Sequence, residues 1–202
     1  MLKLPEVTQL QKSLPKVQIY RKFQLTNSQQ TKFDADISRI DIVNEVSSRT
    51  IPSIKEGEKV KSFYVLSVTL KTKNYETRNI ERIAKLIPQN LVFSLQFEEE
   101  IQIAVFCEKV FATDWMPESK ASIQLTGLNF DEVWENIIKK IEGGEWDNDL
   151  TLEENIDLKE RKEKLQKEIE KIEKLARKET QPKKKFEYVS QKRKLEEEIK
   201  NL

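Results

Sequence analysis

The sequence predicts an α+β fold: a mixed sheet of about five to six strands with packed helices, followed by a C-terminal antiparallel, coiled-coil-like helical hairpin. Three observations predict it. Residues 60–71 alternate as a strand does, residues 91–107 read as a β-hairpin, and residues 158–202 repeat apolar side chains at heptad spacing. The chain has 202 residues, enough for one ordinary domain and an appendage. We therefore expect a body over residues 1–146 and a charged tail over residues 147–202.

The N-terminal part is expected to be helical. Apolar residues at 7, 10 and 14 predict a helix over residues 6–14, and Pro15 marks the start of a second helix over residues 16–23. Asn27 is the expected N-cap of a third helix, with apolar positions at 33, 37 and 40.

The middle of the body is expected to form a strand, a helix and a β-hairpin. Alternation begins near residue 39, and residues 60–71 form the clearest strand. That strand is apolar on both faces, so we expect it to be central. Residues 75–87 return to helical spacing, and residues 91–97 and 101–107 flank an acidic turn.

The body ends in two short strands and a helix. The strands are expected at residues 110–115 and 122–125. Asn129, with Glu132 three residues later, is the expected N-cap of a helix that the glycines at 143 and 144 close.

The tail combines two apolar seams with a proline break at Pro182. Because neither apolar seam is shielded from water on an isolated helix, we expect the two helices to fold back and pack on each other. The alternatives are helices that lie along the body, one long kinked helix, or closure of the seam against a second copy in a homodimer. The seam residues are Leu158, Leu165, Ile169, Ile172 and Ala176 before the break, and Tyr188, Leu195, Ile199 and Leu202 after it.

Missing residue types exclude most familiar chemistry. The chain has no histidine, which removes Ser-His-Asp and Cys-His catalysis and histidine-metal sites. Its four glycines form neither a P-loop nor a G-x-G-x-x-G turn, and Cys107 lies in a strand-like run that suits a structural thiol. We predict no catalytic residues, no metal and no cofactor. No signal or membrane-spanning segment is visible, so a cytoplasmic protein without a membrane partner is expected.

Charge is concentrated in the tail. The chain is 35% charged with a formal net charge of +1, and residues 151–202 hold 16 Lys and Arg against 13 Asp and Glu. Such runs commonly solvate a helix, and the alternative is that they contact phosphates. The densest basic points are Lys183, Lys184 and Lys185 at the tip of the hairpin, and Lys192, Arg193 and Lys194 on the return helix.

Several stretches together resemble a bacterial domain-of-unknown-function family, DUF4391. They are residues 14–23, 33–40, 62–71, 86–88 and 178–181, so the resemblance covers nearly the whole chain. The resemblance implies a setting in which the gene lies beside helicase genes and type III-like restriction or DNA-methyltransferase genes. It transfers no catalytic residue onto these positions.

Three functions are consistent with these observations. The first is a non-catalytic accessory subunit of a phage-defence or restriction-modification system, which binds a helicase, methyltransferase or nuclease subunit. The second is a module that grips nucleic acid through phosphates. The third is a degenerate PD-(D/E)xK-like nuclease with Asp41 and Lys71 as its remnant, although Thr69 stands where a metal-binding acid is needed and the nearby Asp34 and Asp36 are expected on solvated helix positions.

Overall fold

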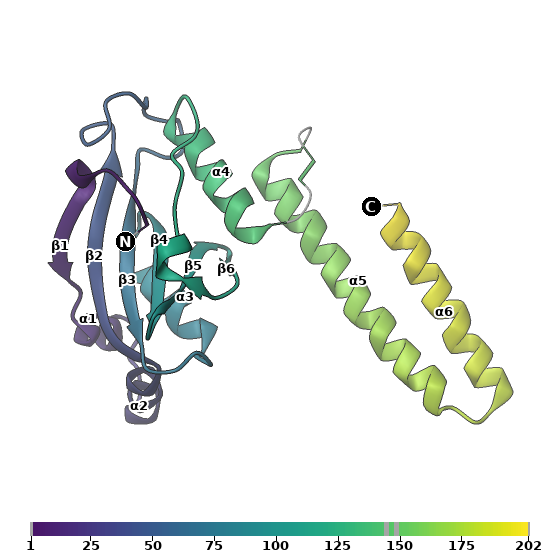
Figure 1. Cartoon of the computed structure of the whole chain (residues 1–202). Coiled ribbons are helices and arrows are strands. Elements are labelled where there is room, and N and C mark those ends of the chain that lie inside the picture. The colour runs from purple at the N-terminus through teal and green to yellow at the C-terminus, as the bar shows by residue number, and fades with distance from the viewer. Residues whose placement is uncertain (1, 144–145, 148–149, 202) are drawn as a thin grey trace. The chain divides into compact units, whose positions relative to one another are not determined.

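The computed structural model describes residues 2–143, 146–147 and 150–201. The chain forms two compact units, Met1–Gly144 and Glu145–Leu202. The first is a mixed sheet with packed helices, and the second holds two long helices packed as a hairpin (Figure 1). The predicted α+β fold with a C-terminal helical hairpin is therefore confirmed.

The sheet has seven strands among the described residues, and its strand order follows the chain. Six strands lie in the order β1-β2-β3-β4-β5-β6, and the two-residue β7 pairs with β5. Neighbours are antiparallel except β3 and β4, which are parallel because α3 (Thr77–Leu86) crosses between them. The strand bounds are β1 Gln9–Ser13, β2 Ile37–Ser47, β3 Ser62–Leu70, β4 Asn90–Phe97, β5 Glu100–Cys107, β6 Lys109–Ala112 and β7 Met116–Pro117.

Strand β3 is central, as its two apolar faces predict. Leu66 and Val68 belong to the main hydrophobic cluster on one face of the sheet. On the other face Phe63 contacts Phe130 and Trp134 of α4 (Phe130–Glu142), with ring centroids 6.5 and 5.7 Å apart. Helices therefore cover both faces of this strand, which explains why it is apolar throughout.

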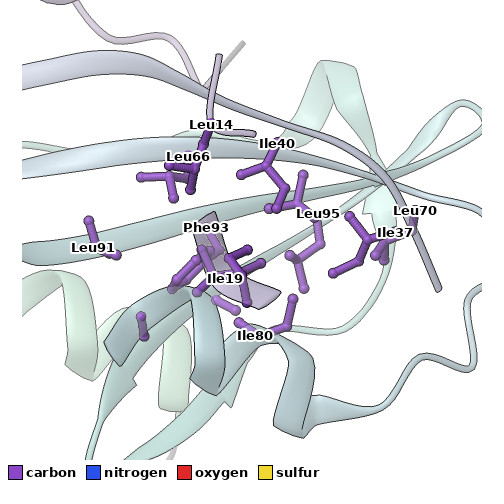
Figure 2. Close-up of a cluster of buried hydrophobic side chains, with 14 of the residues drawn as sticks. Leu14, Ile19, Ile37, Ile40, Leu66, Leu70, Ile80, Leu91, Phe93 and Leu95 are labelled. Atoms are coloured by element: carbon purple, nitrogen blue, oxygen red, sulfur yellow. The ribbon is translucent and has the colours of Figure 1, made fainter. Parts of the chain in front are cut away.

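The main cluster joins the sheet to the N-terminal helices and α3. Ile19 of α1 (Lys16–Lys22) and Phe33 of α2 (Asn27–Asp36) are fully buried in it, together with Ile80 of α3. Figure 2 shows Ile19 of α1 and Ile80 of α3 directed toward the sheet, near Phe93. The buried residues of this cluster lie between positions 14 and 104.

The helix predicted over residues 6–14 is wrong. The segment forms a short 3₁₀ helix, Glu6–Thr8, and then the edge strand β1, which pairs antiparallel with β2. Asn44 of β2 is buried and donates to the Thr8 hydroxyl at 2.8 Å. Val7 is 66% exposed, so it does not belong to the apolar stripe that suggested a helix.

Two smaller expectations also differ from the structure. The N-cap of α2 is Thr26, whose capping box with Gln29 satisfies both residues' backbone N–H groups. Residues 122–125 form no strand, and the additional strand is β7 instead.

Helix α4 is tied to a distant loop by one carboxylate. Asp131 accepts hydrogen bonds from the backbone N–H groups of Glu58 (2.6 Å), Lys59 (3.1 Å) and Val60 (2.7 Å). Partial burial raises the pKa of Asp131, but these three donors and the charge of Lys61 lower it by more, so it lies below its ordinary value. The expected N-cap, Asn129, accepts from the Glu132 backbone N–H.

Candidate functional site

The first helix of the second unit has a capped N-terminus. Helix α5 spans Leu152–Lys178, and its N-cap Thr151 forms a capping box with Glu154. The hydrogen bonds from the Thr151 backbone and hydroxyl hold the pKa of Glu154 below its ordinary value. At about 1.5 Å per residue the helix is about 40 Å long.

A buried asparagine fixes the segment before α5. Asn155 is 3% exposed, and its amide donates to the carbonyls of Asp147, Leu150 and Thr151. Its side-chain oxygen accepts the Asp147 backbone N–H at 2.9 Å. This role is not predictable from the sequence, because an asparagine among charged helix residues looks like an ordinary exposed position.

The expected seam residues of α5 face inward to different degrees. Leu165, Ile169 and Ile172 are buried, whereas Leu158 and Ala176 are half-buried. On α6 (Pro182–Lys200) Tyr188, Leu195 and Ile199 are half-buried, and α6 has no buried residue. Leu202 lies outside the described residues. The seam side chains of α5 are therefore more buried than those of α6.

Ion pairs and the connecting turn set the antiparallel register of the hairpin. Arg161 pairs with Glu198 at 2.7 Å, and Glu173 pairs with Lys192 at 3.6 Å. At the turn the Glu179 carboxylate accepts the backbone N–H groups of Thr180 and Gln181, each at 2.9 Å. Pro182 is then the first residue of α6, a position where its missing N–H costs nothing. Figure 1 shows the two helices side by side, in green and yellow.

The six basic residues expected to meet phosphates have different surroundings. Lys183, Lys184 and Lys185 are exposed and occupy the first turn of α6, next to the turn. Arg193 and Lys194 are also exposed. Lys192 is half-buried and forms ion pairs with Glu173 and Glu196, so carboxylates of the hairpin already balance its charge.

Charge is segregated along the hairpin. Residues 167–194, the distal half, hold eleven Lys and Arg against five Asp and Glu, a net charge of +6. Residues 151–166 and 195–202, the proximal half, hold five against eight, a net charge of −3. The distal half is therefore a strongly basic surface, although the whole chain is nearly neutral.

The outward face of α6 carries apolar side chains. Phe186 is 74% exposed and Val189 is 37% exposed, and they lie one turn apart. Arg193 follows one turn after Val189, so the three residues occupy positions i, i+3 and i+7 of one face. The seam residues Tyr188, Leu195 and Ile199 lie on the opposite face.

The body does not bring together Asp41 and Lys71, the residues of the hypothetical nuclease remnant. Asp41 lies opposite Ser67 in the strand register and is bound by Arg39, with an N–O distance of 2.5 Å. Lys71 is four residues beyond Ser67, which places it about 13 Å away along the sheet. Within the described part of the chain no group of three or more acidic or cysteine side chains could hold a metal ion.

The neighbouring acids have structural partners. Asp36, expected to be solvated, is 9% exposed and accepts the Glu76 backbone N–H and the Asn79 side chain, each at 2.8 Å. Asp34 accepts from Lys16 (2.5 Å) and from the Tyr20 hydroxyl (2.7 Å). Burial raises the pKa of Asp34, but these two donors lower it by more and leave it below its ordinary value. Both acids tie helices of the body together.

Two open hollows are lined by described residues of the body. One, of about 570 Å³, lies beside β1 and the end of α3 and is lined by Leu10, Lys12, Glu45 and Tyr64 among others. The other, of about 230 Å³, has an apolar floor formed in part by Ile137 and Ile141 of α4. None of the residues predicted to form a site lines either hollow.

These features define a class of molecule: an α+β body joined to an antiparallel helical hairpin with a basic distal half. A family model described as "Domain of unknown function (DUF4391)" matches residues 2–199, and the chain belongs to that family. The match includes residues of both units. Comparisons with curated proteins and with solved structures gave no match. Within the described residues no helix is long and apolar enough to cross a membrane.

Proposed function

We propose that this protein is a non-catalytic accessory subunit that docks onto a protein partner through the distal half of its hairpin. The observation that carries the proposal is the segregation of charge, a net +6 over residues 167–194 on a nearly neutral chain. A surface of one sign attracts a partner of the opposite sign and speeds their encounter.

The position of the three tip lysines supports a role in binding. Lys183, Lys184 and Lys185 stand in the first turn of α6, and that turn contains no acidic residue. A helix N-terminus carries partial positive charge, so cations there oppose helix formation. The helix dipole therefore does not favour these lysines at this position, which supports an external anionic surface as their partner.

The class of partner is proposed from the setting that the family resemblance implied. A helicase, methyltransferase or nuclease subunit of a phage-defence or restriction-modification system is the expected partner. The protein would then act in the cytoplasm, as part of an assembly that works on DNA.

Co-purification from cells that encode the neighbouring genes tests this proposal. The full chain should retain one of their products, and the triple variant Lys183→Glu, Lys184→Glu, Lys185→Glu should lose it. The matched control changes Lys12, Lys22 and Lys120 to Glu, which are exposed lysines of the body. Equal retention by the tip variant and the control would rule out the distal half as the docking surface.

Direct contact with nucleic acid is the second candidate. It is favoured by five exposed basic side chains near the turn: Lys183, Lys184, Lys185, Arg193 and Lys194. Phosphate contacts release counterions, so affinity for a DNA duplex should fall by orders of magnitude between about 50 and 200 mM salt. An affinity for DNA that is absent at low salt, or equal in the tip variant, would contradict this candidate.

A further inference from the structure

The outward face of α6 carries apolar and charged side chains in the pattern of a helix that binds in a hydrophobic groove of another protein. Phe186, Val189 and Arg193 lie at i, i+3 and i+7, the spacing with which an amphipathic helix places anchors into a hydrophobic groove. Lys183 lies on the same side, one turn before Phe186, and Arg193 stands at the other end. The face therefore has an apolar centre between two positively charged side chains.

This face is available because the hairpin buries only one side of α6. Tyr188, Leu195 and Ile199 turn toward α5 and are half-buried, whereas Phe186 keeps 74% of its surface exposed. Burying an exposed phenylalanine ring against apolar atoms is favourable. Aromatic and arginine side chains are also the residue types that most often dominate interface energies.

We infer that α6 docks through Phe186, Val189 and Arg193 into an apolar groove with an acidic rim on a partner protein. The inference rests on the proposed docking function and adds the chemistry of the partner's surface. The apolar side chains of this face are best covered by apolar residues of the partner, and Lys183 and Arg193 by carboxylates around them.

Two other occupants fit this face less well. A nucleic-acid backbone would satisfy the charges, but it offers no apolar pocket for Val189 or for the exposed ring of Phe186. A second copy of the chain, packed face to face, would bring Lys183 and Arg193 against the same positive charges, and like charges in contact are repulsive. A groove with an acidic rim satisfies both parts of the face.

Photo-crosslinking in cells identifies the occupant directly. A benzoylphenylalanine in place of Phe186 in the full chain should crosslink to the partner protein, at a peptide in which apolar residues are flanked by Asp or Glu. The control places the same group at Leu128, which is 79% exposed on the body. The inference would be overturned by crosslinks to nucleic acid, to a second copy of the chain, or to a peptide without acidic residues. It would also be overturned if the group at position 186 formed no more crosslinks than the group at position 128.

Affinity for the co-purified partner separates this inference from the proposed function. Phe186→Ser should weaken binding by about 10- to 100-fold, as loss of an interface anchor does, and Arg193→Glu should weaken it similarly. Leu128→Ser should leave it unchanged, and an unchanged circular dichroism spectrum shows that the hairpin remains folded. If Phe186→Ser binds normally while the Lys183, Lys184, Lys185 triple variant does not, the groove is refuted and the docking function stands. If both bind normally, both are refuted.

Discussion

At the scale of single residues, Asp131 joins two parts of the body that are more than seventy positions apart. Its carboxylate receives three backbone N–H groups from residues 58–60, and Gly57 leaves the necessary space. A Cβ atom at Gly57 would lie only 2.3 Å from the Asp131 Oδ1 atom. The glycine and the aspartate therefore form one structural feature.

We expect Asp131→Asn to lower the free energy of unfolding at neutral pH by about 1 to 2 kcal/mol, because the amide keeps only one of two acceptor oxygens. The folded-state pKa of Asp131 lies below the ordinary value of 3.8, so its stabilising effect is present above that value and is lost as pH falls through the folded pKa. Thermal melting of both proteins between pH 7 and pH 3 checks this. A difference in melting temperature that stays constant below pH 4 would contradict it.

Residues that act on close neighbours in the chain were predictable, and residues that act across the fold were not. Asn129 and Glu132 are three positions apart, and their relation is visible as a spacing. Asp36 meets Asn79 across 43 positions, and Asp131 meets Val60 across 71 positions. No local pattern distinguishes these aspartates from solvated ones. The spacing of apolar residues after Pro182 likewise does not show that Phe186 lies outside the two-helix seam.

At the scale of elements, the seam of the hairpin depends on a few side chains of α5. Ile169→Ala should destabilise the hairpin by about 2 kcal/mol or more, since Ile169 is only 4% exposed. Hydrogen exchange should then quicken in α5 and α6 and stay unchanged in β2 and β3. Leu175→Ala, at a position 43% exposed, is the control and should change little. Protection that survives in α6 after Ile169→Ala would show that the seam does not hold the hairpin together.

The first turn of α6 allows stability to be separated from binding. Replacing Lys183, Lys184 and Lys185 with Glu puts acids where the helix dipole favours them, so hairpin stability should be unchanged or higher, by up to about 1 kcal/mol. Denaturation of the full chain, followed by circular dichroism, measures this. A large loss of helix in the triple variant would mean that the lysines serve the fold and not an external partner.

Element types were predicted well where the apolar period was long. Strand β3 and helices α3 and α4 each repeat their pattern over several turns or pairs, and all three are present as expected. Strand β1 has five residues, and Leu10 within it and Leu14 directly after it fit a helix and a strand equally. Its pairing with β2 decided the outcome, and that long-range contact is not visible in the segment itself.

At the scale of the whole molecule, the body has its own complete core. The main cluster lies within residues 14–104, and the second face of β3 is covered by Phe130 and Trp134. A fragment of residues 1–144 should therefore fold alone and melt cooperatively, with Trp115 and Trp134 as fluorescent reporters. A broad, non-cooperative transition would show that the body needs the second unit.

The strand order of the sheet bears on how the chain is made. Because β1 to β6 pair in the order in which they are synthesised, each strand that leaves the ribosome finds its partner already present, and each pairing closes only a short loop. The exception is β4, which has to wait for α3 to pack before it can lie parallel to β3. Until then the apolar strand β3 is an open edge, and unpaired edges invite association between chains. The moment between β3 and β4 is thus the interval of synthesis in which a nascent chain is most exposed to aggregation.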